Sequence, residues 1–282
     1  MNEVLSVKGL CKEYPGFTLD EVSFSLAAGR ITGFIGRSGA GKTTTLKALL
    51  NLVHPSAGEL RFFGLDPARE EFAIKQRIGW AGGTNRYYPK KTVGELAAVT
   101  GGFYENWDAA AFQRCLNRFA LDPAKKLEQL SEGMKQKLNL AIALSHHAEL
   151  LLLDEPTSGL DPVSRDELLE IFLDLKAEGV ALFFSTHIIT DLEKCADDIV
   201  YIQKGRLLFT GGMDEFAAAW LLCEGEAETE AQRAAVRGRS RSRRGETLLL
   251  RKEDAGLFPA DTLRKPGLEE IMTHLEKEAE SE

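Results

Sequence analysis

The chain has 282 residues, of which 28% are charged and 44% are hydrophobic, and its formal net charge at pH 7 is −8. These proportions suit a globular protein with a sizeable core, arranged as one large domain or as one domain with an appendage. The acidic balance argues against a nucleic-acid partner, and no apolar run reaches the roughly 18 residues needed to cross a bilayer, so we expect a cytosolic chain without nucleic acid.

The N-terminal region predicts two short strands, Val4–Val7 and Phe24–Leu26. Between them, the run Lys12–Gly16 contains a Pro-Gly pair and is typical of a loop. An aromatic ring in such a loop, here Tyr14, stacks well on the flat face of an adenine. The same ring also suits a place at the edge of a sheet, and the local pattern leaves both interpretations open.

The next stretch matches the phosphate-loop pattern G-x-x-x-x-G-K-[ST]. Its residues are Gly36, Arg37, Ser38, Gly39, Ala40, Gly41, Lys42, Thr43 and Thr44. An apolar run precedes it and a helix-like run follows, so the backbone N–H groups can surround an anion at a helix N-terminus. Lys42 supplies a positive charge for the β- and γ-phosphates, and the Thr43 hydroxyl is suited to Mg²⁺. An ordinary glycine turn would not require the Lys-Thr pair.

The following segment alternates strands and helices. A turn at Pro55–Gly58 leads into a strand at Glu59–Phe63, Pro67 marks a helix start, and Ile78–Trp80 predicts another strand. The loop Gly82–Pro89 is rich in glycine, aromatic and polar residues, which suits either contact with a partner or burial under neighbouring helices.

Residues 92–144 have a helical pattern. Thr92 and Glu95 fit a capping box, Asp108 fits an N-cap, and the polar turn Leu130–Met134 opens another helix. This region therefore predicts a helical insertion between strands.

The run Leu150–Leu153 predicts a strand buried on both faces, with two acids at its carboxyl end, where open α/β sheets bind ligands. Asp154 is placed to hold Mg²⁺ through water, and Glu155 to act as the general base. A strand followed by an acidic helix cap would explain one of these acids but not their combination with Lys42 and Thr43. A later strand, Val180–Ser185, precedes His187, which is suited to contact a γ-phosphate.

In this order, the motifs resemble the nucleotide-binding domain of an ABC transporter, over roughly residues 1 to 215. The correspondence is Walker A at Gly36–Thr44, Walker B with its catalytic glutamate at Leu150–Glu155, the D-loop at Ser158–Asp161 with Ser158 and Asp161, the switch histidine at His187 and the A-loop aromatic at Tyr14. The resemblance implies an α/β fold, with a P-loop NTPase core, a mixed sheet and a helical subdomain inserted at about residues 84–147.

The family's signature LSGGQ corresponds here to LSEGM, Leu130–Met134, which keeps Ser131 and Gly133 and departs at Glu132 and Met134. In the family this stretch contacts the ATP held by the opposite subunit. The resemblance therefore implies that Ser131, Glu132 and Gly133 act in trans, in a head-to-tail dimer around two ATP molecules. The second subunit would be another copy or a related ATPase.

A second departure is Gly83, which occupies the place of the Q-loop glutamine, while Gln76 lies on the wrong side of the strand to substitute for it. The loss of this glutamine calls into question either the full rate of hydrolysis or the usual coupling between the nucleotide and the membrane partner. It does not remove the predicted base, Glu155.

The LSEGM form and the single nucleotide domain look most like bacterial ABC-2-type exporter ATPases. That resemblance implies Mg²⁺-dependent ATP hydrolysis that drives a separate integral membrane permease of the ABC-2 type. It also implies a peripheral position on the inner face of the cell membrane, with Thr84–Pro89 and the helical region as the contact.

Two alternatives belong to other classes. A non-transport ABC ATPase acting on ribosomes or DNA commonly has two nucleotide domains or a long coiled coil. A nucleotide switch that signals by ATP-dependent dimerisation is suggested by Gly83.

Residues 216–282 form an accessory region, for which we expect a small α+β appendage. Its segment 224–246 combines an acidic run, Glu224–Glu230, with a basic run, Arg233–Arg244, and suits a solvated, partly flexible segment in which little is buried. A contact with anionic lipid or nucleic acid is the alternative. Thr247–Arg251 then predicts a strand. An amphipathic helix follows, with apolar positions Leu268, Ile271, Met272 and Leu275.

Overall fold

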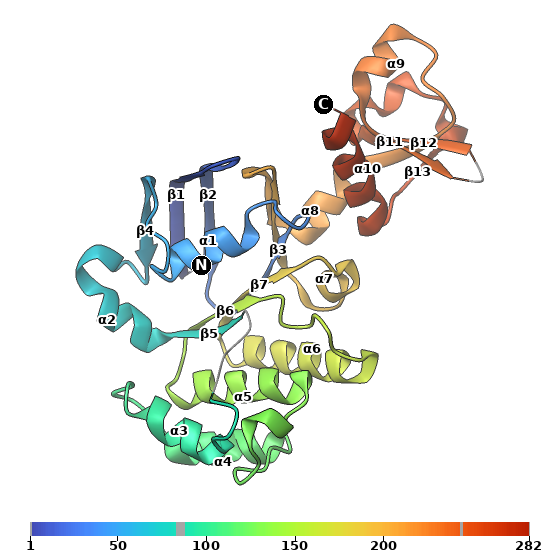
Figure 1. Cartoon of the computed structure of the whole chain (residues 1–282). Helices are drawn as coiled ribbons and strands as arrows, with labels where there is room; N and C mark the ends of the chain where they lie inside the picture. The colour runs from blue at the N-terminus through green and yellow to red at the C-terminus, as the bar shows by residue number, and fades with distance from the viewer. Residues whose placement is uncertain (1, 83–87, 243–244, 282) are drawn as a thin grey trace. The chain divides into compact units, whose positions relative to one another are not determined.

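The computed structural model describes residues 2–82, 88–242 and 245–281. The chain forms two compact units, Met1–Thr210 and Gly211–Glu282 (Figure 1). Within the described residues, every helix is too short or too polar to cross a membrane.

The first unit is organised around a six-stranded sheet with the order β5-β6-β7-β3-β8-β9. Its strands are β3 (Ile31–Ile35), β5 (Ile78–Gly82), β6 (Leu150–Asp154), β7 (Ala181–Thr186), β8 (Asp198–Gln203) and β9 (Arg206–Gly212). The pairs from β5 through β8 are parallel. Leu150 to Leu153 are at most 1% exposed, which confirms a strand buried on both faces. The register pairs Ile35 with Thr186 and Asp154 with Ser185, so β3, β6 and β7 end at one edge.

A three-stranded antiparallel sheet, ordered β2-β1-β4, lies against this core. Its strands are β1 (Glu3–Tyr14), β2 (Phe17–Ala27) and β4 (Ala57–Phe62). Phe24 stacks on Phe183 with ring centroids 5.2 Å apart and lies 6.2 Å from Phe34, which joins the two sheets. Strand β1 is longer than expected, so Tyr14 is its last residue and does not lie in a loop.

Helix α1 (Lys42–Leu49) follows the phosphate loop and contributes Leu46, Ala48 and Leu49 to the same core. On the other side of β3, a Cβ on Gly33 would overlap the side chain of Leu192. Helix α7 (Ile189–Cys195) therefore packs directly on the strand that leads to the phosphate loop. This close approach brings the segment around His187 to the same edge as Lys42.

The helical region contains α3 (Val93–Gly101), α4 (Ala109–Arg118) and α5 (Glu132–Ser145), which lie together in Figure 1. The capping box of Thr92 and Glu95 and the Asp108 cap are confirmed. Ser131 is also an N-cap, since its hydroxyl accepts a 3.2 Å hydrogen bond from the N–H of Met134.

Helix α2 (Pro67–Arg77) precedes β5, and the side chain of its Gln76 forms hydrogen bonds with the segment that follows α3. Gln76 Nε2 donates to the carbonyl of Phe103 (3.1 Å), and Oε1 accepts from the N–H of Glu105 (2.8 Å). Gln76 thus ties α2 to the helical region. Gly83, where the family usually has glutamine, lies outside the described residues.

The second unit is a small α+β fold with a four-stranded sheet of order β11-β12-β10-β13. Its elements are α8 (Met213–Ala218), β10 (Trp220–Glu224), α9 (Glu230–Ala235), β11 (Val236–Ser242), β12 (Gly245–Arg251), β13 (Leu263–Arg264) and α10 (Leu268–Ser281). The predicted strand and amphipathic helix are present, and Leu268, Ile271 and Met272 are buried.

Segment 224–246 contains regular secondary structure, and Ala235 and Gly238 are the buried positions among its described residues. A capping box of Thr229 and Gln232 begins α9, and β11 pairs with β12 along its length. Ala235 is 4% exposed and joins a core with Leu248 and Leu250. Apolar and small residues alternate with the arginines here, which is enough for one buried side on an edge strand.

Candidate functional site

A cleft of about 1170 Å³ opens at the carboxyl ends of the parallel strands. Its lining residues are Tyr14, Gly16, Phe17, Arg37, Ser38, Gly39, Gly41, Lys42, Thr43, Thr44, Lys47, Val53, Glu155, Ser158 and His187. Most of the predicted phosphate-loop residues, the predicted general base Glu155 and the predicted γ-phosphate contact His187 therefore share one site. The wall near Tyr14, Phe17 and Val53 is apolar and suits a flat base.

The phosphate loop is held in its shape by close backbone contacts. Gly36 has φ +154°, and a Cβ there would overlap the carbonyl of Ile202, so only glycine fits. Ala40 is 6% exposed and faces inward, and its carbonyl accepts a 3.0 Å hydrogen bond from the N–H of Gly205. The loop is thereby fixed to the turn between β8 and β9.

The ammonium of Lys42 is buried against this loop. Nζ donates to the carbonyls of Gly36 (2.6 Å) and Arg37 (3.2 Å) and lies 3.7 Å from Glu155 Oε1. Only 7% of the Lys42 side chain is exposed. A buried cation beside the free N–H groups of a helix start is strongly attractive to an anion, because little water screens it.

Two acids project from the end of β6 in different directions. Asp154 Oδ2 accepts a 3.0 Å hydrogen bond from Thr43 Oγ1. Glu155 Oε2 lies 2.8 Å from His187 Nδ1, and its backbone has φ +51°. A left-handed conformation at a residue other than glycine stores strain and directs this side chain towards the cleft.

The pair Thr43 and Asp154 fits Mg²⁺. Both offer hard oxygen donors at hydrogen-bond distance from each other, and Mg²⁺ in nucleotide sites takes one or two protein oxygens together with phosphate and water. The donor set of this chain therefore matches the ion that ATP brings.

The remaining predicted residues lie in two places. Ser158 lines the cleft, whereas Asp161 caps α6 (Pro162–Ala177), where hydrogen bonds from Ser164 lower the pKa of its carboxyl group. Ser131, Glu132 and Gly133 begin α5, and none of them is among the described residues that line the cleft. Glu132 is ion-paired with Lys135 at 2.6 Å.

The sequence analysis missed several contributors. Ser185, fully buried in β7, donates to Asp154 and accepts from the N–H of Glu155. Its only sequence signal is a polar residue at the end of an apolar strand. Phe17, Lys47 and Val53 line the cleft but carry no local motif, because the fold brings them there from separate elements.

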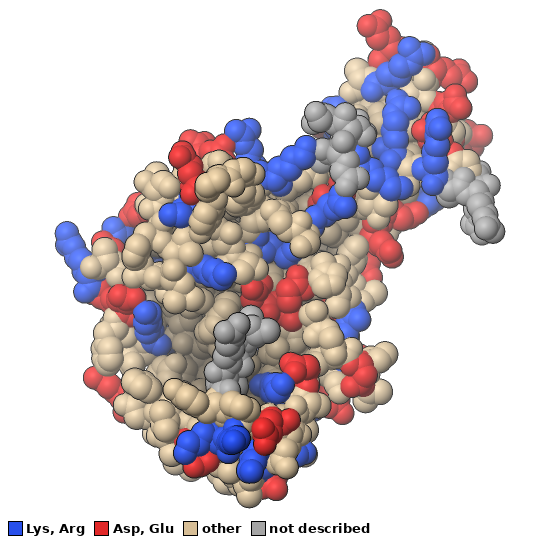
Figure 2. Space-filling view, viewed as in Figure 1, with Lys and Arg blue, Asp and Glu red and all other residues tan. Residues whose placement is uncertain are grey.

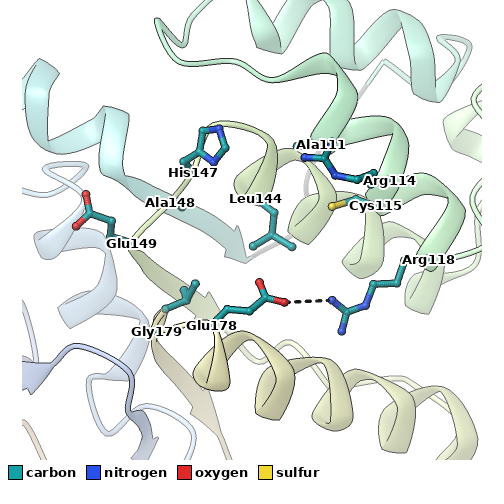
Figure 3. A pocket seen from close by; sticks show the side chains of 11 residues that line it. Ala111, Arg114, Cys115, Arg118, Leu144, His147, Ala148, Glu149, Glu178 and Gly179 are labelled. Carbon is teal, nitrogen blue, oxygen red and sulfur yellow. Dashed lines mark ion pairs between the residues drawn. The ribbon is translucent and has the colours of Figure 1, made fainter.

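A second hollow, of about 460 Å³, lies near the amino ends of β6 and β7 (Figure 3). Its charged groups have partners. Arg118 pairs with Glu178 (3.8 Å), as drawn in Figure 3, and Glu149 pairs with Arg77 (2.5 Å). This hollow lacks the phosphate loop and the acids of the cleft, so the predicted phosphate-binding residues lie at the opposite strand ends.

Comparisons with known proteins agree with this geometry. The ABC transporter family model matches residues 19–158. Bacitracin transport ATP-binding protein BcrA of Bacillus licheniformis is 34% identical over 212 residues, 74% of this chain and 69% of the relative. ABC transporter ATP-binding protein NatA of Bacillus subtilis is 32% identical over 200 residues, 69% of this chain and 81% of the relative.

The probable multidrug ABC transporter ATP-binding protein YbhF of Escherichia coli is 35% identical over 75% of this chain, which spans 38% of that relative. Among solved structures, an ATP-binding subunit of an ABC transporter is similar with a TM-score of 0.69 and 29% identity, over 75% of this chain and 91% of that one. The expected P-loop ABC ATPase fold is thus confirmed. The chain belongs to the ATP-binding proteins of ABC transporters and is an ATPase of that family.

Proposed function

We propose that this chain hydrolyses Mg²⁺-ATP, as one of two ATPase subunits, to drive a separate ABC-2-type permease in the export direction. The observation that carries the proposal is the convergence of Lys42, Thr43, Asp154, Glu155 and His187 in one cleft. The names of two relatives, which mention bacitracin transport and multidrug transport, support an exporter.

Each of these residues has a separate role in an in-line displacement at the γ-phosphate. Lys42 and the loop N–H groups bind the phosphates, and Thr43 with Asp154 would hold Mg²⁺, which would neutralise developing phosphate charge. Water oxygen bonds to the γ-phosphorus while the bond to the β–γ bridging oxygen breaks, and the proton of the water passes to Glu155. His187 orients the Glu155 carboxylate and contacts the γ-phosphate. The products are ADP and phosphate.

The dimer part of the proposal rests on Ser131. This exposed residue begins α5 away from the cleft of its own chain, with Gly133 buried beside it. The N–H groups of a helix start are suited to an anion, and a second subunit in head-to-tail orientation would place Ser131 and Gly133 on the ATP held by Lys42. The second subunit is a copy of this chain or a related ATPase.

A hollow of about 220 Å³ between α1, α2 and β5 is suited to the permease. Its lining is mostly apolar and includes Leu52, Ile74, Trp80 and Tyr104. We propose that a cytoplasmic helix of the permease docks here, beside the exposed Phe72, which would hold the chain against the inner face of the membrane. Tyr88 of the expected contact loop is also exposed, while residues 83–87 lie outside the described residues.

On the face drawn in Figure 2, Lys and Arg side chains of the first unit are interspersed with Asp and Glu. Such a mixed surface does not provide the continuous basic field on which nucleic-acid binding depends. The face drawn in Figure 2 therefore gives no support to the nucleic-acid alternative.

Replacing Glu155 by Gln tests the assignment. Steady-state phosphate release should fall by about a hundredfold or more, while the affinity for ATP stays near the wild-type value, because the change removes the proton acceptor but not the phosphate loop. The matched control is Glu105→Gln, which makes the same change on an exposed side chain. Undiminished turnover in the Glu155→Gln chain would show that another group is the base.

A further inference from the structure

Two contacts join the segment that carries Glu155 to the segment that carries His187. At the cleft, Glu155 Oε2 lies 2.8 Å from His187 Nδ1. In the interior, Thr157 Oγ1 donates a 2.6 Å hydrogen bond to Asp191 Oδ2. Thr157 follows Glu155 by two residues, and Asp191 follows His187 by about one helical turn. Both contacts therefore connect the same two stretches of chain.

Asp191 is a buried carboxylate with a partner on each oxygen. Its exposed fraction is 0%, and that of Thr157 is 1%. Oδ1 accepts a 2.5 Å hydrogen bond from Arg165 Nε, while a second nitrogen of Arg165 donates to Thr190 Oγ1 at 2.7 Å. A carboxylate without water is stable only when its charge and both oxygens are satisfied, and here they are.

The partners of Asp191 lie on either side of the D-loop. Thr157 precedes Ser158, and Arg165 lies in the first turn of α6, whose N-cap is Asp161. One side chain of α7 therefore holds both ends of the segment that leads from the general base to α6. Movement of that segment relative to α7 would break at least one of these bonds.

Glu155 depends on such restraints because its own backbone is strained. With φ +51°, a residue other than glycine stays in place only where neighbouring contacts hold it. The backbone N–H of Glu155 donates a 2.9 Å hydrogen bond to Ser185 Oγ. The carbonyl of Glu155 accepts a 3.1 Å hydrogen bond from the N–H of Ser158. Thr157 lies inside that turn, and its bond to Asp191 is the side-chain anchor of the turn.

We propose that Asp191 is a positioning residue for the hydrolytic reaction, which acts on the general base through Thr157 and Arg165. The inference rests on the proposed role of Glu155. It differs from a purely structural role in what it predicts: loss of the Asp191 contacts should lower the rate of the chemical step, with little effect on ATP binding.

Three substitutions test this inference in the full-length chain. Asp191→Asn keeps the shape but removes the charge that faces Arg165, and Thr157→Val removes only the hydroxyl. Each should lower kcat by about tenfold, with KM for ATP within about twofold of wild type. Thr157→Ser restores the hydroxyl and should recover most of the rate. The control is Asp166→Asn, which removes the exposed ion pair between Asp166 of α6 and Lys194 of α7.

The decisive readout is Asp191→Asn in the Glu155→Gln background, measured as single-turnover phosphate release. If Asp191 acts through Glu155, the second change adds no further loss, because the group that it positions is already gone. A further tenfold loss, or a kcat of the Asp191→Asn chain equal to that of Asp166→Asn, would overturn the inference. If Glu155→Gln itself keeps full turnover, the proposed function fails instead, and the two failures are distinguishable.

Discussion

Ser185 donates a hydrogen bond of 2.6 Å to Asp154 Oδ1 from the middle of the parallel sheet. The same hydroxyl oxygen accepts the N–H of Glu155 at 2.9 Å. One buried side chain on β7 thus orients the acid suited to Mg²⁺ and the backbone of the proposed general base. This link between adjacent strands follows from their register, which places Asp154 opposite Ser185.

Replacing Ser185 by Ala should reduce the rate of ATP turnover by about tenfold, which corresponds to one buried hydrogen bond of roughly 1.4 kcal/mol. The affinity for Mg²⁺ in the presence of ATP should fall as well, because Asp154 loses its partner. Steady-state phosphate release over a Mg²⁺ titration measures both effects. The control is Ser145→Ala, since Ser145 is equally buried and its hydroxyl donates to the carbonyl of Ala141 in its own helix. Equal effects of the two changes would contradict a specific role for Ser185.

A head-to-tail dimer predicts complementation between two inactive chains. Lys42→Ala disables the phosphate loop, and Ser131→Asp keeps the N-cap of α5 but places a negative charge where the partner's phosphate should lie. In their mixed dimer one composite site contains both changes and the other contains neither. Mixing should therefore restore phosphate release to about a quarter of the wild-type rate under statistical exchange. Mixed dimers that form but stay inactive would rule out the head-to-tail arrangement.

Burial raises the pKa of the Cys195 thiol to about 12, and the nearby carboxylates of Asp191 and Asp197 add to the effect. At pH 8 only about one thiol in ten thousand is then a thiolate, which is the reactive form. Iodoacetamide should leave Cys195 unmodified in the folded chain and modify it in denaturant, as read by peptide mass spectrometry. Cys11, which is only half-buried, serves as the internal comparison. Equal labelling rates in the folded chain would contradict the packing of α7.

In the second unit, the Arg264 guanidinium lowers the pKa of Glu270 from 4.5 to about 2, chiefly through a hydrogen bond. The folded state therefore prefers the carboxylate. Its stabilisation is present above the unfolded pKa of 4.5 and is lost as the pH falls towards 2. Because 40% of the Glu270 side chain is exposed, solvent screening limits the effect to about 1 kcal/mol.

Glu270→Gln should accordingly lower the free energy of unfolding of this unit by about 1 kcal/mol at pH 7 and by much less near pH 2. Trp220 is the one tryptophan of the second unit, so its fluorescence reports unfolding when Trp80 and Trp107 are replaced by Phe. The control is Glu269→Gln, which makes the same change at the exposed residue next to Glu270. A pH-independent difference between the Gln variants and the parent chain would contradict the ion-pair explanation.

The local structure around the candidate site could largely be predicted from the sequence. The phosphate loop Gly36–Thr44 was predictable from local sequence, because the glycines, the lysine and the helix start are adjacent in the chain. The leucine run before Asp154 likewise predicts a doubly buried strand, since only a central parallel strand hides both faces. The helix caps at Thr92 and Asp108 were predictable because capping is a contact between residues three positions apart.

The accessory region was less readable. Its arginines and glutamates indicated a solvated segment, yet β11 forms part of a sheet with a buried core. Composition indicates which side chains are solvated but not which strands pair, because burial of one side of a strand requires only every second residue and a partner strand supplies the rest.

The sequence by itself determined which groups could bind phosphate, hold Mg²⁺ and accept a proton, because those capacities belong to residue types at short spacings. The tertiary structure alone decided that Ser185 joins Asp154 to Glu155 and that Asp191 bonds Thr157 and Arg165. Each of these contacts joins residues that are 26 to 34 positions apart in the sequence, so no local pattern contains them. They form only when strand register and helix packing bring the segments together.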